Sequence, residues 1–548
     1  MEKEKVNRSQ QPKDGFLGFK ENWKADMTSG FLVFLLALPL SLGIAGASEF
    51  PPIYGLVTAM IGGLVVSLMA GSVLTIKGPA AGLIVIVAGA VAEMGHGDTT
   101  LGWGMALGAI FVAALLQVVF GLVKLGKLTD FFPISAVHGM LAAIGIIIIS
   151  KQLHILFGMN PMTPEGKAMV EPVELLVELK NTFANAFAHS DVAIIGLVSL
   201  AIVFGWPMLP FKALKKIPSA IVVLVVAIPM VQIMGVHNVA ADPTKGVKAF
   251  SPLLEFNQGF FDIMKVNISF DGMKDMGVFI KYVVMFALVG SLEALLTVKA
   301  IDMMDPWKRR SKTNKDLIAV GVGNMVASVF GGLPMISEVA RSSANVSNGA
   351  KTRWANFYHG LFILLFLLFD ISFSGLIPKS ALAAMLIGVG WKLAHPKEFG
   401  HMAKIGKEQV IIFVTTIVVT LTTDLLIGIA AGILLKVITQ SIFGVPFKVM
   451  FKAPITKSEN RIEVSGAAVF SNFIGIKKAI LEHSYESRIT LDVTACKYID
   501  HTVIENLHHM KDDFIVEGGD IEIIGIDEFK PATGSNHKFA ALRQVKKL

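Results

Sequence analysis

The sequence predicts an all-α polytopic membrane protein with about fourteen spanning segments and a small cytosolic α/β domain at its end. Of the 548 residues, 53% are hydrophobic and 17% are charged, whereas soluble domains carry about 25% charged residues. Apolar runs recur from about residue 30 to residue 444. Beyond about residue 450 they give way to short alternating patterns. These observations set a transmembrane domain at 30–444, a linker at 445–457 and an α/β domain at 458–548.

The apolar runs, taken in order, have the length of bilayer-spanning helices, which need roughly 20 residues each. They lie near residues 30–48, 53–70, 79–94, 101–123, 134–150, 191–210, 218–235, 276–299, 316–330, 338–350, 356–376, 380–394, 409–422 and 424–443. The third and the tenth are too short to cross alone.

Loop charge supports an even number of spans. If residues 1–29 form a retained cytosolic arm, the loops that return to the cytosol carry Lys or Arg, whereas the short outer loops SEFPP, MGHGDTT and TTD carry neither. Positive charge favours the cytoplasmic side. We therefore expect a multi-pass protein of the cell inner (plasma) membrane with both termini cytoplasmic. The net charge of +7 reflects these loops, so no nucleic-acid partner is predicted.

The two short segments resemble each other. Residues 71–83 (GSVLTIKGPAAGL) and 330–343 (FGGLPMISEVARSS) each place Gly and Pro before a truncated apolar stretch, third in the first seven segments and third in the next seven. Paired interruptions of this kind indicate an inverted-repeat transporter with its site near the bilayer midplane. We therefore expect a 7+7 arrangement.

Broken helices present free backbone N–H groups and the positive ends of their dipoles, which bind anions. Pro79 suits a first helical position because its missing donor costs nothing there. The residues predicted to face the anion are Ala80, Ala81, Gly82, Val339, Ala340 and Arg341. For Arg341 the alternative is a side chain that reaches toward the cytosol. Lys77 either lines the site or reaches the cytosolic rim.

Glu293 lies in the middle of the apolar run VMFALVGSLEALLTVKA (284–300). A charged side chain at a helix centre costs about 2.5–3.5 kcal/mol on insertion scales, so it usually faces a cavity with a partner. We predict that Glu293 has a coupling or substrate role, in which it takes up and releases a proton, with Thr297 one turn further on the same face. A structural salt bridge is the alternative. Ser41 either binds the ligand or bonds back to its own helix.

Strand-like runs and helical patterns alternate in residues 461–525. This domain has no Gly-rich phosphate loop, and its adjacent His508 and His509 point in different directions on a helix. With a single cysteine in the chain, no disulfide framework is possible. We predict no catalytic residue, metal or cofactor, and hence no enzyme.

The chain resembles the sulfate permease (SulP) family, whose animal relatives are solute carrier family 26. The stretches that carry the resemblance are LTIKGPAAGL, GSLEALLTVKA, KDLIAVGVGNMVASVFGGLP and EVARSSANVSNGAKTR, together with the STAS-like tail ITLDVTACKYIDHTVIENL. It implies core and gate domains, a homodimer, elevator-type alternating access, and an anion held between the third and tenth helices. Sodium-coupled bicarbonate members carry Asp at the position of Glu293, so Glu favours H⁺ over Na⁺. Thr502 stands where bacterial STAS regulators carry a phosphorylated serine.

The sequence thus predicts a secondary active transporter of a small inorganic anion, sulfate or bicarbonate, driven by H⁺ through Glu293. The alternatives are a carrier of C4-dicarboxylates, a Na⁺-coupled bicarbonate carrier, a nucleobase permease, and a STAS-linked membrane protein that senses an anion.

Overall fold

The protein was analysed as a computed structural model, which describes residues 11–127, 132–159, 169, 171–210, 217–238, 251–254, 259–369, 376–535 and 537–544. The first ten residues of the predicted cytosolic arm lie outside these ranges. The chain divides into two compact units. The described residues of the larger unit fall within Arg8–Gly126 and Ile144–Leu393, and those of the smaller unit fall within Lys127–Ala143 and Ala394–Leu548.

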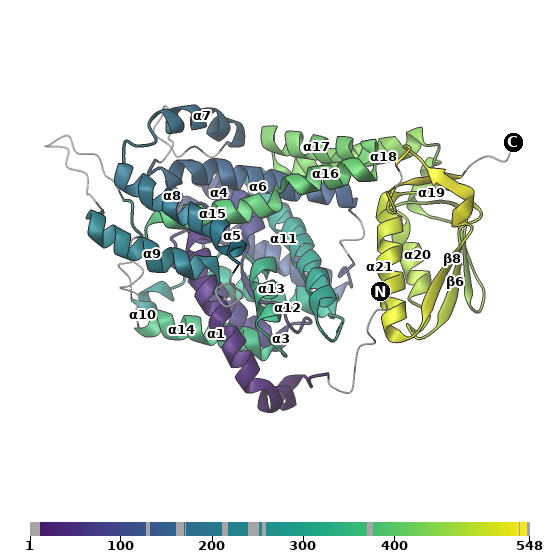
Figure 1. Cartoon of the computed structure of the whole chain (residues 1–548), viewed down its shortest axis with the longest axis horizontal. Helices are drawn as coiled ribbons and strands as arrows, with labels where there is room; N and C mark the ends of the chain where they lie inside the picture. The colour runs from purple at the N-terminus through teal and green to yellow at the C-terminus, as the bar shows by residue number, and fades with distance from the viewer. Residues whose placement is uncertain are drawn as a thin grey trace. The chain divides into compact units, whose positions relative to one another are not determined.

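The larger unit is helical (Figure 1). Its first helices are α1 (Gly15–Ala47), α2 (Ile53–Ile61), α3 (Ser67–Met69), α4 (Ile84–Met94) and α5 (Thr99–Leu122). A π-helical turn (Gly62–Val66) joins α2 to α3, and a 3-10 turn (Ala81–Leu83) precedes α4. After these come α7 (Pro172–Ala184), α8 (Ser190–Gly205), α9 (Ser219–Met234), α10 (Phe260–Ile263), α11 (Met276–Met304), α12 (Thr313–Val329), α13 (Val339–Ser347), α14 (Trp354–Phe369) and α15 (Lys379–Leu393). Helix α6 (Ile134–Leu156) begins in the smaller unit and ends in the larger.

A helix lies at each of the fourteen positions at which the sequence predicts an apolar segment. By length and composition, six helices in the described part of the chain are long and apolar enough to cross a bilayer, and four further apolar helices are shorter. Helix α5 packs along α12, and α1 packs along α14. Aspartates cap several of these helices. For example, Asp98 accepts from the amides of Thr100 and Leu101, which satisfies donors that a helix start leaves free.

The smaller unit holds α16 (Pro396–Ile405), α17 (Lys407–Thr422), α18 (Leu425–Ile442) and α19 (Phe447–Phe451), followed by an α/β region. That region contains α20 (Phe473–Ile480), α21 (His501–Glu517), and the strands β3 (Ile455–Lys457), β4 (Arg461–Val464), β5 (Gly466–Ala468), β6 (Arg488–Asp492), β7 (Cys496–Ile499), β8 (Asp520–Ile524), β9 (Phe529–Pro531) and β10 (Leu542–Gln544). The predicted alternation of strands and helices over 461–525 is therefore present.

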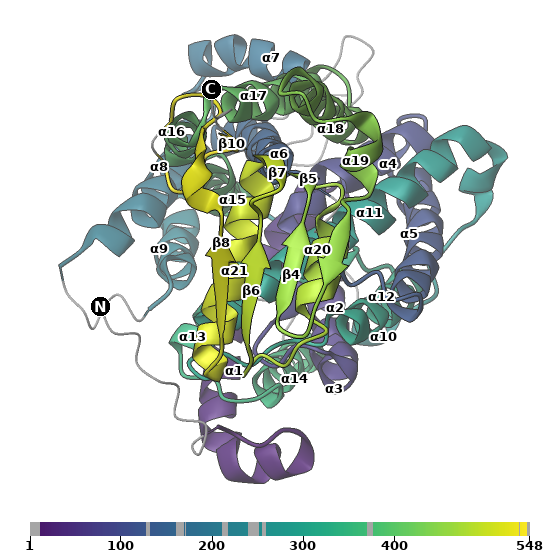
Figure 2. The same cartoon turned by 90° about the vertical axis from the view of Figure 1, so that its right-hand side faces the viewer.

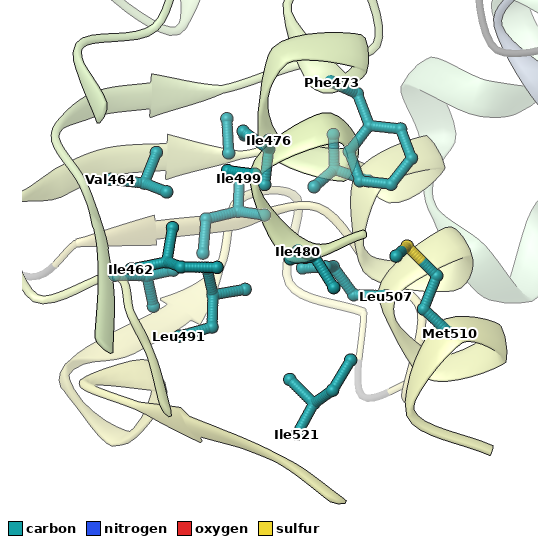
Figure 3. Packing of buried hydrophobic residues seen from close by; sticks show 14 of the residues in the cluster. Ile462, Val464, Phe473, Ile476, Ile480, Leu491, Ile499, Leu507, Met510 and Ile521 are labelled. Carbon is teal, nitrogen blue, oxygen red and sulfur yellow. The ribbon is translucent and has the colours of Figure 1, made fainter. Parts of the chain in front are cut away.

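Two four-stranded sheets form, in the orders β3-β4-β6-β8 and β5-β7-β10-β9. Strands β4, β6 and β8 pair in parallel, and Figure 2 shows them side by side with α20 and α21 behind them. Parallel strands need such helical crossovers. The core between helices and sheet is apolar (Figure 3): Ile462, Leu491 and Ile521 come from the strands, Phe473 and Leu507 from the helices.

The segment 445–457, which the sequence analysis treats as a linker, contains α19 and β3. Val445 and Met450 are buried in one apolar cluster with Ala467, Val469 and Tyr498 of the α/β region. Phe443, just after α18, stacks on Tyr498 with ring centroids 5.4 Å apart. The α/β region therefore packs directly against the segment that leads into it.

Candidate anion-binding site

Two short strands bring the two interrupted segments together. Strand β1 (Lys77–Pro79) pairs antiparallel with β2 (Met335–Ser337), and Lys77 lies opposite Ser337 and Pro79 opposite Met335. Strand β1 leads into the 3-10 turn before α4, and β2 leads into α13. Because the strands are antiparallel, the two helix starts lie at opposite ends of the ladder, about 7 Å of strand apart at ~3.4 Å per residue.

Side-chain amides close the free edges of this ladder. Asn324 on α12 accepts from the amide of Met335 at 2.6 Å and donates to its carbonyl at 3.2 Å. On the other strand, Asn356 of α14 accepts from the amide of Lys77 at 3.4 Å and donates to the carbonyl of Gly62 at 3.1 Å. Irregular backbone at membrane depth is tolerated only where its polar groups find such partners. The two strands are thereby fixed in place.

The start of α4 keeps part of its donor capacity. The amide of Ala80 donates to the carbonyl of Pro334 at 3.3 Å, but those of Ala81 and Gly82 donate to no other described residue. Helix α11 places Glu293 there: a Cβ on Gly82 would overlap both carboxylate oxygens of Glu293. The acidic side chain therefore lies directly at the helix end that the sequence predicts to bind an anion.

The start of α13 is different, because Glu338 caps it. Its side chain accepts from the amide of Arg341 at 2.8 Å, as an N-cap residue does. Val339 is 49% exposed and Ala340 is partly exposed. Arg341 is fully buried, and its Nη1 lies where a Cβ on Gly78 of β1 would be. The guanidinium thus turns back onto the strand ladder and does not reach toward solvent.

Several buried polar side chains around the ladder have no hydrogen-bond partner among the described residues. These are the hydroxyls of Ser41 on α1 and Ser291 on α11, both carboxylate oxygens of Glu293, all three guanidinium nitrogens of Arg341, and both ring nitrogens of His359 on α14. Each such group costs about 1–3 kcal/mol, and more when charged. Acidic and basic side chains that both lack hydrogen-bond partners are expected at a site where a polar ligand, a proton or water supplies the missing partners.

The electrostatic neighbours of these groups are few. The carboxylate of Glu338 interacts with both Glu293 and Arg341. Glu338 is therefore an electrostatic neighbour of both the acidic and the basic member of the cluster. An anion entering this region meets the two bare amides of α4 and the charge of Arg341, and is opposed by Glu293 when that group is ionised.

A second group of buried charges lies on the same ladder and is complete. Lys77 Nζ donates to Asp316 Oδ2 at 2.9 Å and to the hydroxyls of Ser72, Thr75 and Ser337 at 2.8, 2.6 and 2.7 Å. Asp316 Oδ1 also accepts from the amides of Gly71 and Ser72 at 3.1 and 3.0 Å. Lys77 therefore neither lines an open site nor reaches the cytosolic rim. It anchors β1 to α12.

Of the predicted site residues, the structure brings Glu293 to Ala81 and Gly82, and Arg341 to the strand that precedes them. Ser41 makes no back-bond to its own helix, since its hydroxyl is unpartnered within the described chain. Thr297 is buried on α11, one turn beyond Glu293.

The sequence analysis missed Glu338 as a cap, Asp316 as the partner of Lys77, and His359. The signal for His359 was present: a single histidine in the apolar run WANFYHGLFILLFLLF (354–369), much like the isolated carboxylate that identified Glu293.

Thr502, which the resemblance to STAS regulators predicts to stand at the position of their phosphorylated serine, is 2% exposed. Its hydroxyl accepts from the amide of Ile134 at 3.3 Å. In this arrangement no kinase reaches it. Nearby, Asp500 caps α21 through the amide of Val503 at 2.8 Å and accepts from Gln440 on α18 at 2.9 Å.

Known proteins share this fold and sequence. The chain is 27% identical over 538 residues to the putative sulfate transporter YvdB of Bacillus subtilis, covering 95% of this chain and 96% of that protein. It is 24% identical over 414 residues to the bicarbonate transporter BicA of Picosynechococcus, covering 75% of this chain and 69% of that protein.

Two solved structures match at the level of fold. The transmembrane domain of a cyanobacterial bicarbonate transporter BicA covers 75% of this chain, with 97% of that domain matched, a TM-score of 0.62 and 22% identity. The structure of SLC26A9 covers 96% of this chain, with 89% of that protein matched, a TM-score of 0.65 and 15% identity. A mostly helical membrane-protein fold with a C-terminal α/β region is thus confirmed.

The model of the sulfate permease family matches residues 23–416, a span that includes every element of the strand ladder and all the orphaned side chains described above. The resemblance seen in the sequence is therefore confirmed, and the chain belongs to the sulfate permease family.

Proposed function

We propose that this protein is a secondary active transporter of a small inorganic anion, sulfate or bicarbonate, that moves together with H⁺ bound to Glu293. The observation that carries the proposal is the contact between the carboxylate of Glu293 and Gly82 at the start of α4. This carboxylate has no hydrogen-bond partner within the described part of the chain. The names of the relatives, which are sulfate and bicarbonate transporters, support the choice of anion.

The coupling follows from like-charge repulsion. An ionised Glu293 places a negative charge at the helix end where the anion binds, and two like charges about 4 Å apart repel by about 4 kcal/mol at an effective dielectric of 20. Protonation removes that charge and leaves the amides of Ala81 and Gly82 and the guanidinium of Arg341 to hold the anion. Proton and anion therefore bind together and leave together, which is symport.

Alternating access completes the cycle. We infer an elevator-type movement, a 7+7 inverted repeat and a homodimer, in keeping with the family. The repeat is supported by the equivalence of the two strand-to-helix passages, β1 into α4 and β2 into α13. The charge of the loops supports an inner-membrane location with both termini in the cytoplasm.

The test is uptake of labelled sulfate and labelled bicarbonate into proteoliposomes, with a pH gradient and a Na⁺ gradient imposed separately. We expect the pH gradient to drive accumulation in the wild type, and Glu293→Gln to abolish that drive while leaving anion exchange. Accumulation driven by Na⁺ alone would favour the Na⁺-coupled alternative. Accumulation of a C4-dicarboxylate in place of both anions would change the substrate, and no flux of any anion would favour a sensor.

A further inference from the structure

His359 is a fully buried histidine whose two ring nitrogens have no hydrogen-bond partner among the residues that the structure describes. Buried histidines are normally satisfied, because an imidazole that loses water without replacement costs about 1–3 kcal/mol. The ring therefore has capacity for a ligand that is not part of the chain.

The backbone around His359 is held rigidly against the strand ladder. Asn356 lies three residues earlier on the same face of α14, and it holds the amide of Lys77 and the carbonyl of Gly62. The next residue, Gly360, approaches Gly63 so closely that a Cβ on either would overlap the backbone of the other. Helix α14 therefore packs closely against β1 and the π-helical turn through Asn356 and Gly360, the residues on either side of His359 along this part of the helix.

Arg341 also reaches strand β1. Its Nη1 lies against Gly78, the residue after Lys77, and its charge acts on His359. All three nitrogens of the guanidinium are unpartnered within the described residues, as are both nitrogens of the imidazole. Buried donor groups that lack acceptors are complementary to an oxyanion, which offers several acceptor oxygens.

We infer that His359 is a ligand of the carried oxyanion and binds it together with Arg341. This inference rests on the proposed function and deepens it, because it names a second protein side chain for the same substrate. A neutral imidazole offers one N–H donor and one acceptor nitrogen. The N–H donates to an oxygen of the anion while the guanidinium supplies the charge, so that His359 sets orientation and Arg341 supplies most of the attraction.

The test compares two replacements with a matched control. His359→Leu replaces the imidazole with an apolar side chain of comparable volume and so removes both polar atoms. His359→Gln retains a donor and an acceptor. Ile363→Val, one turn further along α14 and equally buried, measures the effect of a small packing change in the same helix. Each variant is purified in full length and reconstituted at equal protein content.

Two measurements are made on each variant. The first is the apparent KM for sulfate and for bicarbonate uptake, and the second is the rise in melting temperature on adding each anion without any gradient. We expect His359→Leu to raise the apparent KM by about ten- to hundredfold for the carried anion, the loss of one hydrogen bond to a charged partner, and to abolish the thermal shift. His359→Gln should recover most of both, and Ile363→Val should change neither.

An unchanged KM and thermal shift in His359→Leu would overturn the inference, as would a fall in melting temperature alone, the result expected if His359 holds only a buried water. A wild type that no oxyanion stabilises would overturn it too. The proposed coupling fails separately: a wild type that binds and carries the anion without response to a pH gradient refutes the role of Glu293 but leaves that of His359 intact.

Discussion

Two groups of buried polar side chains, which contact the strand ladder β1–β2 or the segments next to it, differ in one respect. In the first, Lys77 and Asp316 satisfy each other and are surrounded by hydroxyls and amides, with distances of 2.6 to 3.1 Å. In the second, Glu293, Arg341 and His359 are as deeply buried but have no partner among the described residues. Lys77 belongs to β1, and Arg341 reaches the next residue of that strand, Gly78. Glu293 contacts Gly82, three residues after the strand ends.

This difference suits the complete group to a structural role and the incomplete group to the proposed site. A complete network in a low dielectric holds the backbone in one place, because removing any member leaves the others unpaired. An incomplete network costs stability and persists only where its gaps are used. The first group fixes the position of the helix starts, and in the proposed function the second binds the proton and the anion there.

The largest effect on stability is expected when the carboxylate in each group is replaced in turn by an amide of the same shape. Asp316→Asn should lower stability by about 3–5 kcal/mol, because Lys77 loses its counter-charge in a buried site. The asparagine side chain also has one acceptor oxygen where the aspartate has two, so some of the donors that bond to Asp316 lose their acceptor. Thermal unfolding of the detergent-solubilised protein measures this loss.

Glu293→Gln is the matched control. It removes a buried charge that has no partner in the described structure, so the melting temperature should stay the same or rise. Equal destabilisation by the two amides would break the distinction between the groups.

The next prediction concerns the space between Gly82 and the carboxylate of Glu293. Gly82→Ala places a methyl group where the carboxylate of Glu293 lies, so the side chain must leave the helix end. We expect proton-driven uptake to fall by about a hundredfold, as a small misplacement at a reacting centre can cause, with the protein still folded. Gly43→Ala on α1, whose nearest neighbours would be 3.5 Å away, should transport normally. Normal uptake by Gly82→Ala would show that the position of Glu293 is not critical.

A third experiment replaces the whole complete pair. Lys77→Met combined with Asp316→Leu removes both charges together, and buried ion pairs exchanged for apolar residues are often neutral in stability. We expect the double variant to be more stable than Asp316→Asn by about 2 kcal/mol or more, measured by the same unfolding assay. Stability as low as that of the single variant would mean that the surrounding hydroxyls, and not the charges, carry the network.

The smallest effect distinguishes two buried serines. Ser337→Ala deletes one acceptor of Lys77 and should cost about 0.5–1.5 kcal/mol. Ser291→Ala deletes a hydroxyl with no partner in the described chain and should cost nothing or stabilise slightly. The comparison needs only melting temperatures, and the opposite order would contradict the assignment of the two groups.

Much of this arrangement was predictable from the sequence. The apolar runs located the helices because burying backbone in lipid leaves few alternatives to a helix. The Gly and Pro interruptions located the two strand-to-helix passages, and an isolated carboxylate in an apolar run identified Glu293. The alternating patterns after residue 460 identified the α/β region.

The sequence alone therefore determined the class of protein, the broken segments and the chemistry at their ends, because these depend on local composition and on the solvent that each segment meets. Only the tertiary structure decided that Lys77 pairs with Asp316, 239 residues away along the chain, while Arg341 and His359 find no partner among the residues that the structure describes. Which buried charges meet depends on how distant helices pack, and no local pattern records that.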